Sequence, residues 1–395
     1  MRGVAAERAF ERIFRGAPRE RAAEEAWRAF AERGLPTTRD EDWRFTPLAA
    51  LESVEFAAPE AGEIPAQALA AACARVGDAR RTTATTRASL GSAIDPKLAP
   101  FAALNAALAD GGELIDVSAA CSRQLPFHLI RWLGGGAQLA SPRVRITVRA
   151  GARATVIEHF LGASDAHSLA NSATELVLER GAQLDYVQLQ ELPETAFHVS
   201  SLAARQEADS RLRATSLALG ARLSRVQVLA TLSGEGAELE LAGLYLGRGS
   251  QHQDHHTTID HASPRTTSRE LFKGILDGRA HGVFHGRVQV RPGAQKIDAA
   301  QTNRALLLSD GAVVDSKPQL EIYADDVKCS HGASIGQLDP DQLFYLRSRG
   351  LDPVAARALL SFAFASEVLE RLPLPALREA LEERLLAWLP RKSAP

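Results

Sequence analysis

A Gly-Ala step leads into seven short segments between residues 151 and 333, in a region where apolar and polar residues alternate as in β-strands. The strand-like runs include RVRITV (143–148), TELVLE (174–179), RVQVLATL (225–232) and ELELAGLYL (238–246). The steps are Gly151-Ala152, Gly181-Ala182, Gly220-Ala221, Gly236-Ala237, Gly293-Ala294, Gly311-Ala312 and Gly332-Ala333. Glycine accepts the backbone angles of a tight corner. The chain is therefore predicted to turn sharply between many short strands, with no helices between them.

Two architectures accommodate such strands: an antiparallel sandwich or barrel, and a parallel β-helix in which each coil stacks on the one before. An antiparallel meander of this length needs many hairpin turns. The Asp-Gly pairs typical of those turns begin only at Asp110, Asp277 and Asp310. The sequence therefore favours a mainly β fold with a parallel β-helix core that starts at about residue 113.

Helical patterns flank this core on both sides. Apolar residues recur at spacings of four and three over residues 23–30. Towards the C-terminus, Asp339-Pro340 and Asp352-Pro353 each place a capping residue before a first-turn proline, and Pro375 leads a third helix. These helices serve either to cap the core or to dock a partner. The expected domains are a mostly helical domain over 1–112, the β-helix core over 113–337 and a three-helix domain over 338–395.

Charge and composition exclude several classes of partner. Lys and Arg total 46 against 48 for Asp and Glu, so no global basic field favours nucleic acid or an anionic membrane. No stretch has about 18 consecutive apolar residues, and the N-terminus lacks the apolar run of a signal peptide. We therefore expect a cytoplasmic protein. Its three widely spaced cysteines are expected to be free thiols: Cys73, Cys121 and Cys329.

Cys329 and His331 form the first candidate metal site. In a strand, residues two apart face the same side, so the thiol and the imidazole project together. Both are ligands for iron, zinc or copper. Two ligands make only half a site, which a second chain or a transient sulfur species would complete. The alternative is that Cys329 packs as a small apolar residue and that His331 is a hydrogen-bonded side chain.

His252, Asp254 and His256 form the second candidate, because they alternate along one strand face while His255 lies on the other. Two histidines and a carboxylate are typical of a mononuclear metal triad. The alternative is a polar strand face with ordinary hydrogen bonds.

Other signs of an enzyme are missing from the sequence. His281 and His285 are spaced four apart in a strand-like run and receive no predicted role. The chain has no G-x-G-x-x-G, G-x-x-x-x-G-K-[ST], G-x-S-x-G or H-E-x-x-H motif. Nucleotide binding, serine hydrolysis and zinc proteolysis therefore lose their usual support.

The C-terminal third resembles a known family. The run AAQTNRALLLSDGAVVDSKPQLEIYADDVKCSHGASIGQLDPDQLFYLRSRG (299–350) is similar to the SufB/SufD family of iron-sulfur cluster assembly scaffolds. Upstream, Gln251, His252, Asp254 and His261 match the family's Q-H-x-D and later histidine. PTTRDEDWRFTPL (36–48) resembles its N-terminal signature. Thr302 stands where the SufB branch has a cysteine, and residues 329–332 replace its Glu-His-Glu run, so the SufD branch is favoured.

The resemblance implies a right-handed parallel β-helix and a scaffold without enzymatic activity of its own. It implies pairing with SufB through the β-helix, docking of the ATPase SufC by the C-terminal helices, and possible homodimers when the chain is alone. By resemblance, His331 lies at the SufB interface, where a SufB cysteine supplies a thiolate and Cys329 is the neighbouring thiol. A transient Fe-S cluster or iron is expected there, and no stable cofactor.

Two other functions remain open at this point. The first is a β-helix metalloenzyme that uses His252, Asp254 and His256 on a sugar or small acid, which a deep cleft beside those residues would support. The second is a purely structural partner that only recruits SufC. In that case Cys329 and His331 would be dispensable for cluster formation.

Overall fold

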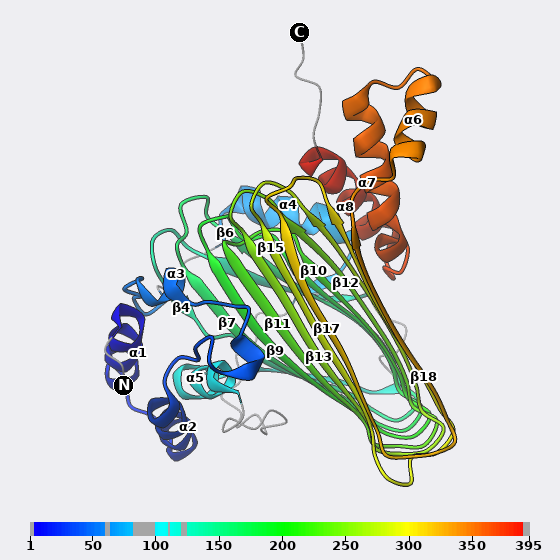
Figure 1. The fold of residues 1–395 in the computed structure, drawn as a ribbon. Coiled ribbons are helices and arrows are strands. Elements are labelled where there is room, and N and C mark those ends of the chain that lie inside the picture. Colours follow the sequence, from blue (N-terminus) through cyan, green and yellow to red (C-terminus); the bar gives the residue numbers. More distant parts are fainter. Residues whose placement is uncertain (1–3, 60–63, 82–98, 110, 120–124, 390–395) are drawn as a thin grey trace.

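Two parallel β-sheets wind together into a β-helix in the computed structural model, which describes residues 4–59, 64–81, 99–109, 111–119 and 125–389 (Figure 1). The first sheet has the order β1 (Arg80–Arg81), β3 (Phe127–Leu133), β6 (Arg153–Gly162), β8 (Gln183–Gln190), β10 (Arg211–Ala218), β12 (Glu238–Gly247), β14 (Thr267–Leu276), β16 (Ile297–Leu307) and β18 (Val327–Gly336). The second has the order β17 (Val313–Ile322), β15 (His281–Val290), β13 (His252–His261), β11 (Leu223–Leu232), β9 (Phe197–Gln206), β7 (Leu169–Leu178), β5 (Arg143–Val148) and β2 (Glu113–Val117), with β4 (Leu139–Ala140) beside β7.

The chain alternates between the two sheets, so each strand pairs in parallel with a strand of the next coil. Ala299 on β16, for example, pairs with Cys329 on β18. The predicted parallel β-helix is therefore confirmed. Its corners explain the glycines, because Gly151, Gly181 and Gly236 adopt φ angles of 67°, 68° and 72°, which side chains disfavour.

Six of the seven Gly-Ala steps lie between strands, but Gly332-Ala333 lies inside β18, so the prediction of a corner there is wrong. The reason is that β18 belongs to the last coil. The chain does not turn into another strand here, and it continues extended to Gly336 before it enters the C-terminal helices.

Helices precede and follow the β-helix. The N-terminal ones are α1 (Ala5–Arg15), α2 (Arg21–Arg33), the 3-10 turn η1 (Glu41–Trp43), α3 (Ala49–Glu52), α4 (Ala66–Val76) and α5 (Pro100–Leu108). The C-terminal ones are α6 (Pro340–Ser348), α7 (Pro353–Leu369) and α8 (Pro375–Trp388). The Asp339 and Asp352 carboxylates accept hydrogen bonds from backbone N–H groups in the first turns of α6 and α7, as their capping role predicts. Across the described ranges, no helix combines the length and apolar character needed to cross a membrane.

Apolar side chains fill the inside of the β-helix and bind the helices to its outer faces. Val228, Leu239 and Phe284 belong to the interior cluster. A second cluster joins α1, α2 and α5 to the outer face of β7, β9 and β11, and a third joins α4, α7 and α8 to that of β8, β10, β12 and β14. The N-terminal segment is therefore held on one outer face and the C-terminal helices on the other.

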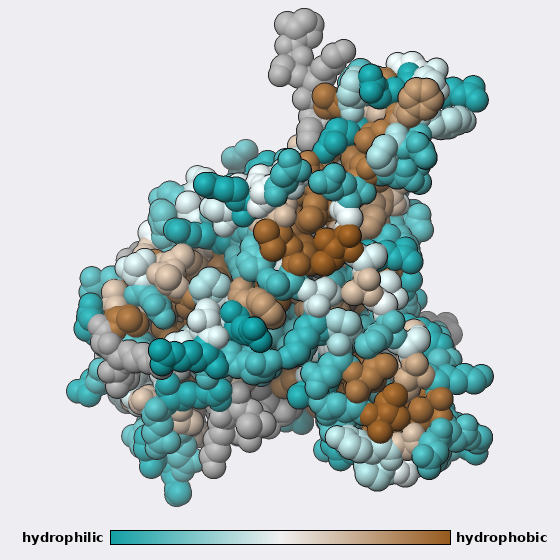
Figure 2. Space-filling view, viewed as in Figure 1, coloured by the Kyte–Doolittle hydropathy of each residue, from teal (hydrophilic) through white to brown (hydrophobic). Residues whose placement is uncertain are grey.

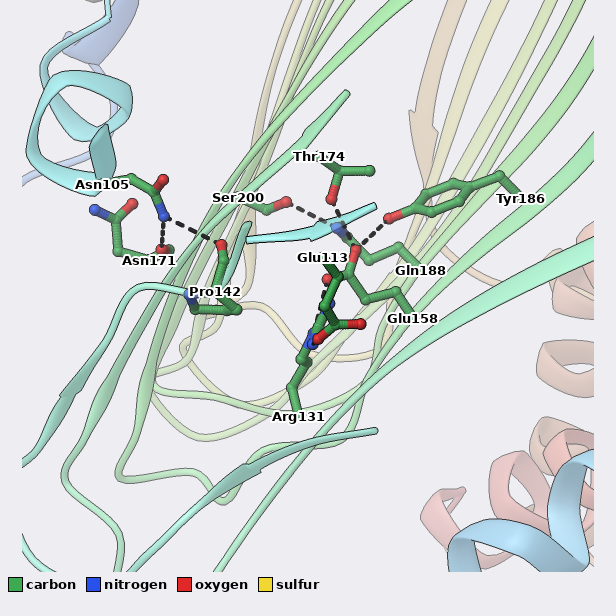
Figure 3. A network of polar contacts seen from close by, with 10 residues as sticks. All are labelled: Asn105, Glu113, Arg131, Pro142, Glu158, Asn171, Thr174, Tyr186, Gln188 and Ser200. Atoms are coloured by element: carbon green, nitrogen blue, oxygen red, sulfur yellow. Dashed lines mark hydrogen bonds and ion pairs between the residues drawn. The ribbon is translucent and has the colours of Figure 1, made fainter. Parts of the chain in front are cut away.

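The interior also contains buried polar groups that bond to one another (Figure 3). Glu158 on β6 accepts hydrogen bonds from Tyr186 Oη at 2.7 Å and Thr174 Oγ1 at 2.8 Å, and it pairs with Arg131. Because an unpaired buried charge is costly, this network fixes how these coils stack.

Candidate metal centre

β18 carries Cys329 and His331 at the end of the first sheet. It pairs with β16 on one edge, and no strand of the described chain pairs with its other edge. Of the two strands of this last coil, β17 is only half-buried and β18 is largely exposed. The strands of the preceding coils are mostly buried. The candidate ligands therefore lie on the open end of the β-helix, at the right of Figure 1.

The two side chains share the inner strand face but differ in burial. Cys329 is half-buried and packs with Leu320, Ala324 and Val327 against the interior cluster. His331 is exposed because no further coil covers it. Burial raises the pKa of the Cys329 thiol, and the charge of Asp298 adds to this, although a backbone hydrogen bond at Ala299 opposes it. The thiol is therefore protonated near neutral pH in the isolated chain.

A buried polar pair lies directly behind His331. Glu270 on β14 pairs with Gln301 on β16, and Gln301 pairs with His331. Gln301 Nε2 donates a 2.5 Å hydrogen bond to Glu270 Oε2, and both side chains are buried. The sequence did not predict these two residues, because the sequence of one strand does not show which residues of the previous coil pair with it.

The second candidate set lies far from β18, on the outer face of β13. His252, Asp254 and His256 share that face, whereas His255 points inward against Tyr245 and Phe272. The residues 41–46 of the N-terminal segment cover this face.

Asp254 is the centre of this set and is already engaged. Thr46 Oγ1 donates to Asp254 Oδ2 at 2.6 Å and lies 3.0 Å from His252 Nε2, and Arg225 forms a buried ion pair with the same carboxylate. Burial would raise the pKa of Asp254, but Arg225 and His256 outweigh it and the pKa is lowered. Burial lowers the pKa of His252 to about 4.

A different trio comes together beside it. The rings of His256 and His285 pack edge to face, with centroids 4.9 Å apart on paired strands. One ligand atom each of Asp42, His256 and His285 lie within 4.8 Å of one another. Asp42 and His285 were not predicted. The strand period of two would have placed His281 and His285 on one face, whereas the contact with Asp42 depends on how the N-terminal segment docks.

A cavity of about 610 Å³ lies elsewhere, between α1 and the strands β3 to β5. Its lining includes Arg12, Arg131 and Phe160, but none of His252, Asp254 and His256. This cavity therefore gives no support to a β-helix metalloenzyme centred on those three residues.

Comparisons with known proteins cover most of the chain. Residues 131–364 match the family model described as SUF system FeS cluster assembly, SufBD core domain. The iron-sulfur cluster assembly protein SufD of Escherichia coli is 32% identical, over 95% of this chain and 94% of the relative. SufBD family iron-sulfur cluster assembly proteins of Synechocystis sp. and Mycobacterium tuberculosis are 32% and 31% identical, each over 88% of this chain, and over 86% and 87% of the relatives. The chain therefore belongs to the SufBD family of iron-sulfur cluster assembly proteins.

Proposed function

We propose that this chain is a SufD-like scaffold subunit that pairs with SufB through its last coil and holds a nascent Fe-S cluster, or its iron, with His331 and Cys329. The observation that carries the proposal is that both residues lie on β18, whose outer edge is unpaired in the described chain. An exposed edge strand offers backbone donors and acceptors to a partner strand. A ligand on such an edge can be completed by the partner.

The surface of the last coil supports pairing with another protein. Val313 and Ile322 on β17 and Ile335 on β18 are exposed, and Figure 2 shows apolar surface over β17. Apolar residues on a free edge favour association. The same edge would let two copies of the chain pair when SufB is absent.

The C-terminal helices support docking of SufC. α6 has no buried residue, and it projects away from the β-helix in Figure 1. Phe344 and Tyr345 on α6 are 73% and 56% exposed, and Leu359 on α7 is also exposed. Large aromatic side chains at this exposure are typical anchors of an interface. In this proposal ATP hydrolysis belongs to SufC, and the complex works in the cytoplasm.

The test is co-purification with SufB and SufC, followed by anaerobic cluster reconstitution with wild type, His331→Ala and Cys329→Ala. We expect every form to assemble, and His331→Ala to lose most cluster formation, with Cys329→Ala affected less. Gly332→Ala is the matched control on β18, because a Cβ there meets no atom within 4 Å. If the chain binds neither partner, the assignment fails. If both variants build cluster normally, the chain is a structural partner only.

SufC docking is tested separately with Phe344→Ala. Because this side chain is not part of any core, the variant should keep its thermal stability while SufC binding weakens by tenfold or more, as expected on loss of about 1.4 kcal/mol or more at an anchor residue. Leu386→Ala, on the exposed face of α8, is the control and should bind SufC normally. Unchanged binding by Phe344→Ala would remove α6 from the interface.

A further inference from the structure

The turn η1 brings Asp42 against the outer face of β13 and β15, far along the chain from both. One ligand atom each of Asp42, His256 and His285 lie within 4.8 Å of one another. Neighbouring contacts hold this arrangement: Trp43 of the same turn stacks on Arg225, with the guanidinium carbon 3.9 Å from the ring centre, and Glu41 pairs with Lys317. The two histidines and the carboxylate therefore come from elements held in place by other interactions.

One buried polar atom of the trio lacks a hydrogen bond. Among the described residues, His285 Nε2 has no hydrogen-bond partner. Buried polar atoms are nearly always satisfied, and an ion is one of the few explanations for those that are not. Asp254 lies beside the trio and is paired with it, since its Oδ1 is 3.0 Å from His256 Nε2.

The charge around the trio suits a cation. Two of the nearby positive groups, Lys317 and Arg225, are already paired, with Glu41 and Asp254 respectively. Neither of these two pairs uses the Asp42 carboxylate. A further positive charge is accommodated here without leaving Lys317 or Arg225 unpaired.

We propose that Asp42, His256 and His285 bind a divalent transition-metal ion with the ligand preference of Zn²⁺. Imidazole nitrogens and carboxylate oxygens are ligands for Zn²⁺ at about 2.0–2.2 Å, which brings ligand atoms to roughly 3.3 Å from one another in a tetrahedral site. The side chains must therefore close by up to about 1.5 Å from the 4.8 Å limit of the present arrangement. Asp254 beside His256 is placed either to orient that imidazole or to act as a fourth ligand.

Such an ion would join the N-terminal segment to the β-helix, and this goes beyond the function proposed for β18. The site belongs to β13, β15 and η1, whereas His331 lies at the open end of the other sheet. A failure of this metal-site proposal can therefore be distinguished from a failure of the cluster proposal for β18.

The experiment uses the full chain in a Cys329→Ser/His331→Ala background, which removes the two candidate ligands on β18. Binding of Zn²⁺ is followed by calorimetry and that of Co²⁺ by its visible absorption, for the parent, His285→Ala and Asp42→Asn. His281→Ala is the matched control, since His281 lies on the same strand face but pairs with Asp315. Thermal unfolding with and without Zn²⁺ checks each fold and reports binding independently.

We expect the parent to bind one equivalent of either ion at micromolar concentration, and His285→Ala and Asp42→Asn to weaken binding at least about tenfold. Zn²⁺ should raise the unfolding temperature of the parent and of His281→Ala, but not that of His285→Ala. The proposal is overturned if the parent binds neither ion, or if His285→Ala and Asp42→Asn bind as the parent does.

Discussion

Gln301 lies between Glu270 and His331 in the parallel register of three successive coils, and it donates a hydrogen bond to the Glu270 carboxylate. The exposed imidazole of the candidate site thus lies at the end of a stack whose other two members are buried. A charge on Glu270 would therefore lie two coils behind the candidate site.

Glu270 should make the stability of the chain depend on pH. Burial raises its pKa from 4.5 to about 7. Between these values the folded chain holds a proton that the unfolded chain has lost, so the free energy of unfolding should fall as pH rises from about 4.5 to 7, by about 3 kcal/mol in all. The Glu270→Gln variant has no carboxyl group at this position, so its free energy of unfolding should fall less over this pH range. Denaturant unfolding of both forms at pH 5 and pH 8 measures it, and an equal pH response in the two forms would contradict the assignment.

Cys329 should react slowly with alkylating agents in the isolated chain. Its pKa is raised chiefly by burial, and only the thiolate is nucleophilic. The rate of iodoacetamide modification, followed by mass spectrometry of the Cys329 peptide, should therefore reach half its maximum at a higher pH than that of a free cysteine peptide. A midpoint at or below that of the peptide would show that the thiol is activated without a partner.

Arg225 should stabilise the fold strongly because it neutralises the fully buried Asp254. The two residues are 1% and 0% exposed. Removing one partner of a buried pair leaves an uncompensated charge and costs about 3–5 kcal/mol, so Arg225→Met should lower the free energy of unfolding by that amount. Arg211→Met, which breaks an exposed pair with Glu238, is the control and should cost less than about 1 kcal/mol. Equal losses in the two variants would argue against burial as the cause.

Gly243 should tolerate no side chain, because the interior is filled there. A Cβ at this position would lie 2.2 Å from two ring atoms of Phe272. Overpacking of this kind costs about 1–3 kcal/mol or more, so Gly243→Ala should lower the unfolding temperature clearly. Gly249→Asn offers a contrast, since Gly249 has open space and a φ of 60° that asparagine tolerates better than most residues. A neutral Gly243→Ala would mean that the ring can move aside.

The fold could be predicted because its signals are local. The run 143–148 coincides with β5, and the aspartate-proline pairs mark the starts of α6 and α7. The site could be predicted only in part. The spacing of Cys329 and His331 places them on one strand face. Their pairing with Ala299 and Gln301, however, depends on the length of the loops between coils. The contact of Asp42 with His256 depends on docking of a distant segment, which no periodicity records.

The open end of the β-helix has a consequence for when its ligands become ordered. In a stacked, quasi-one-dimensional fold, an inner coil is held by neighbours on both sides and the terminal coil by one. Local opening therefore costs less at β17 and β18 than in the inner coils, and their backbone amides should exchange their hydrogens faster. A partner strand added to this edge supplies the missing neighbour, so that assembly and the immobilisation of Cys329 and His331 become a single event.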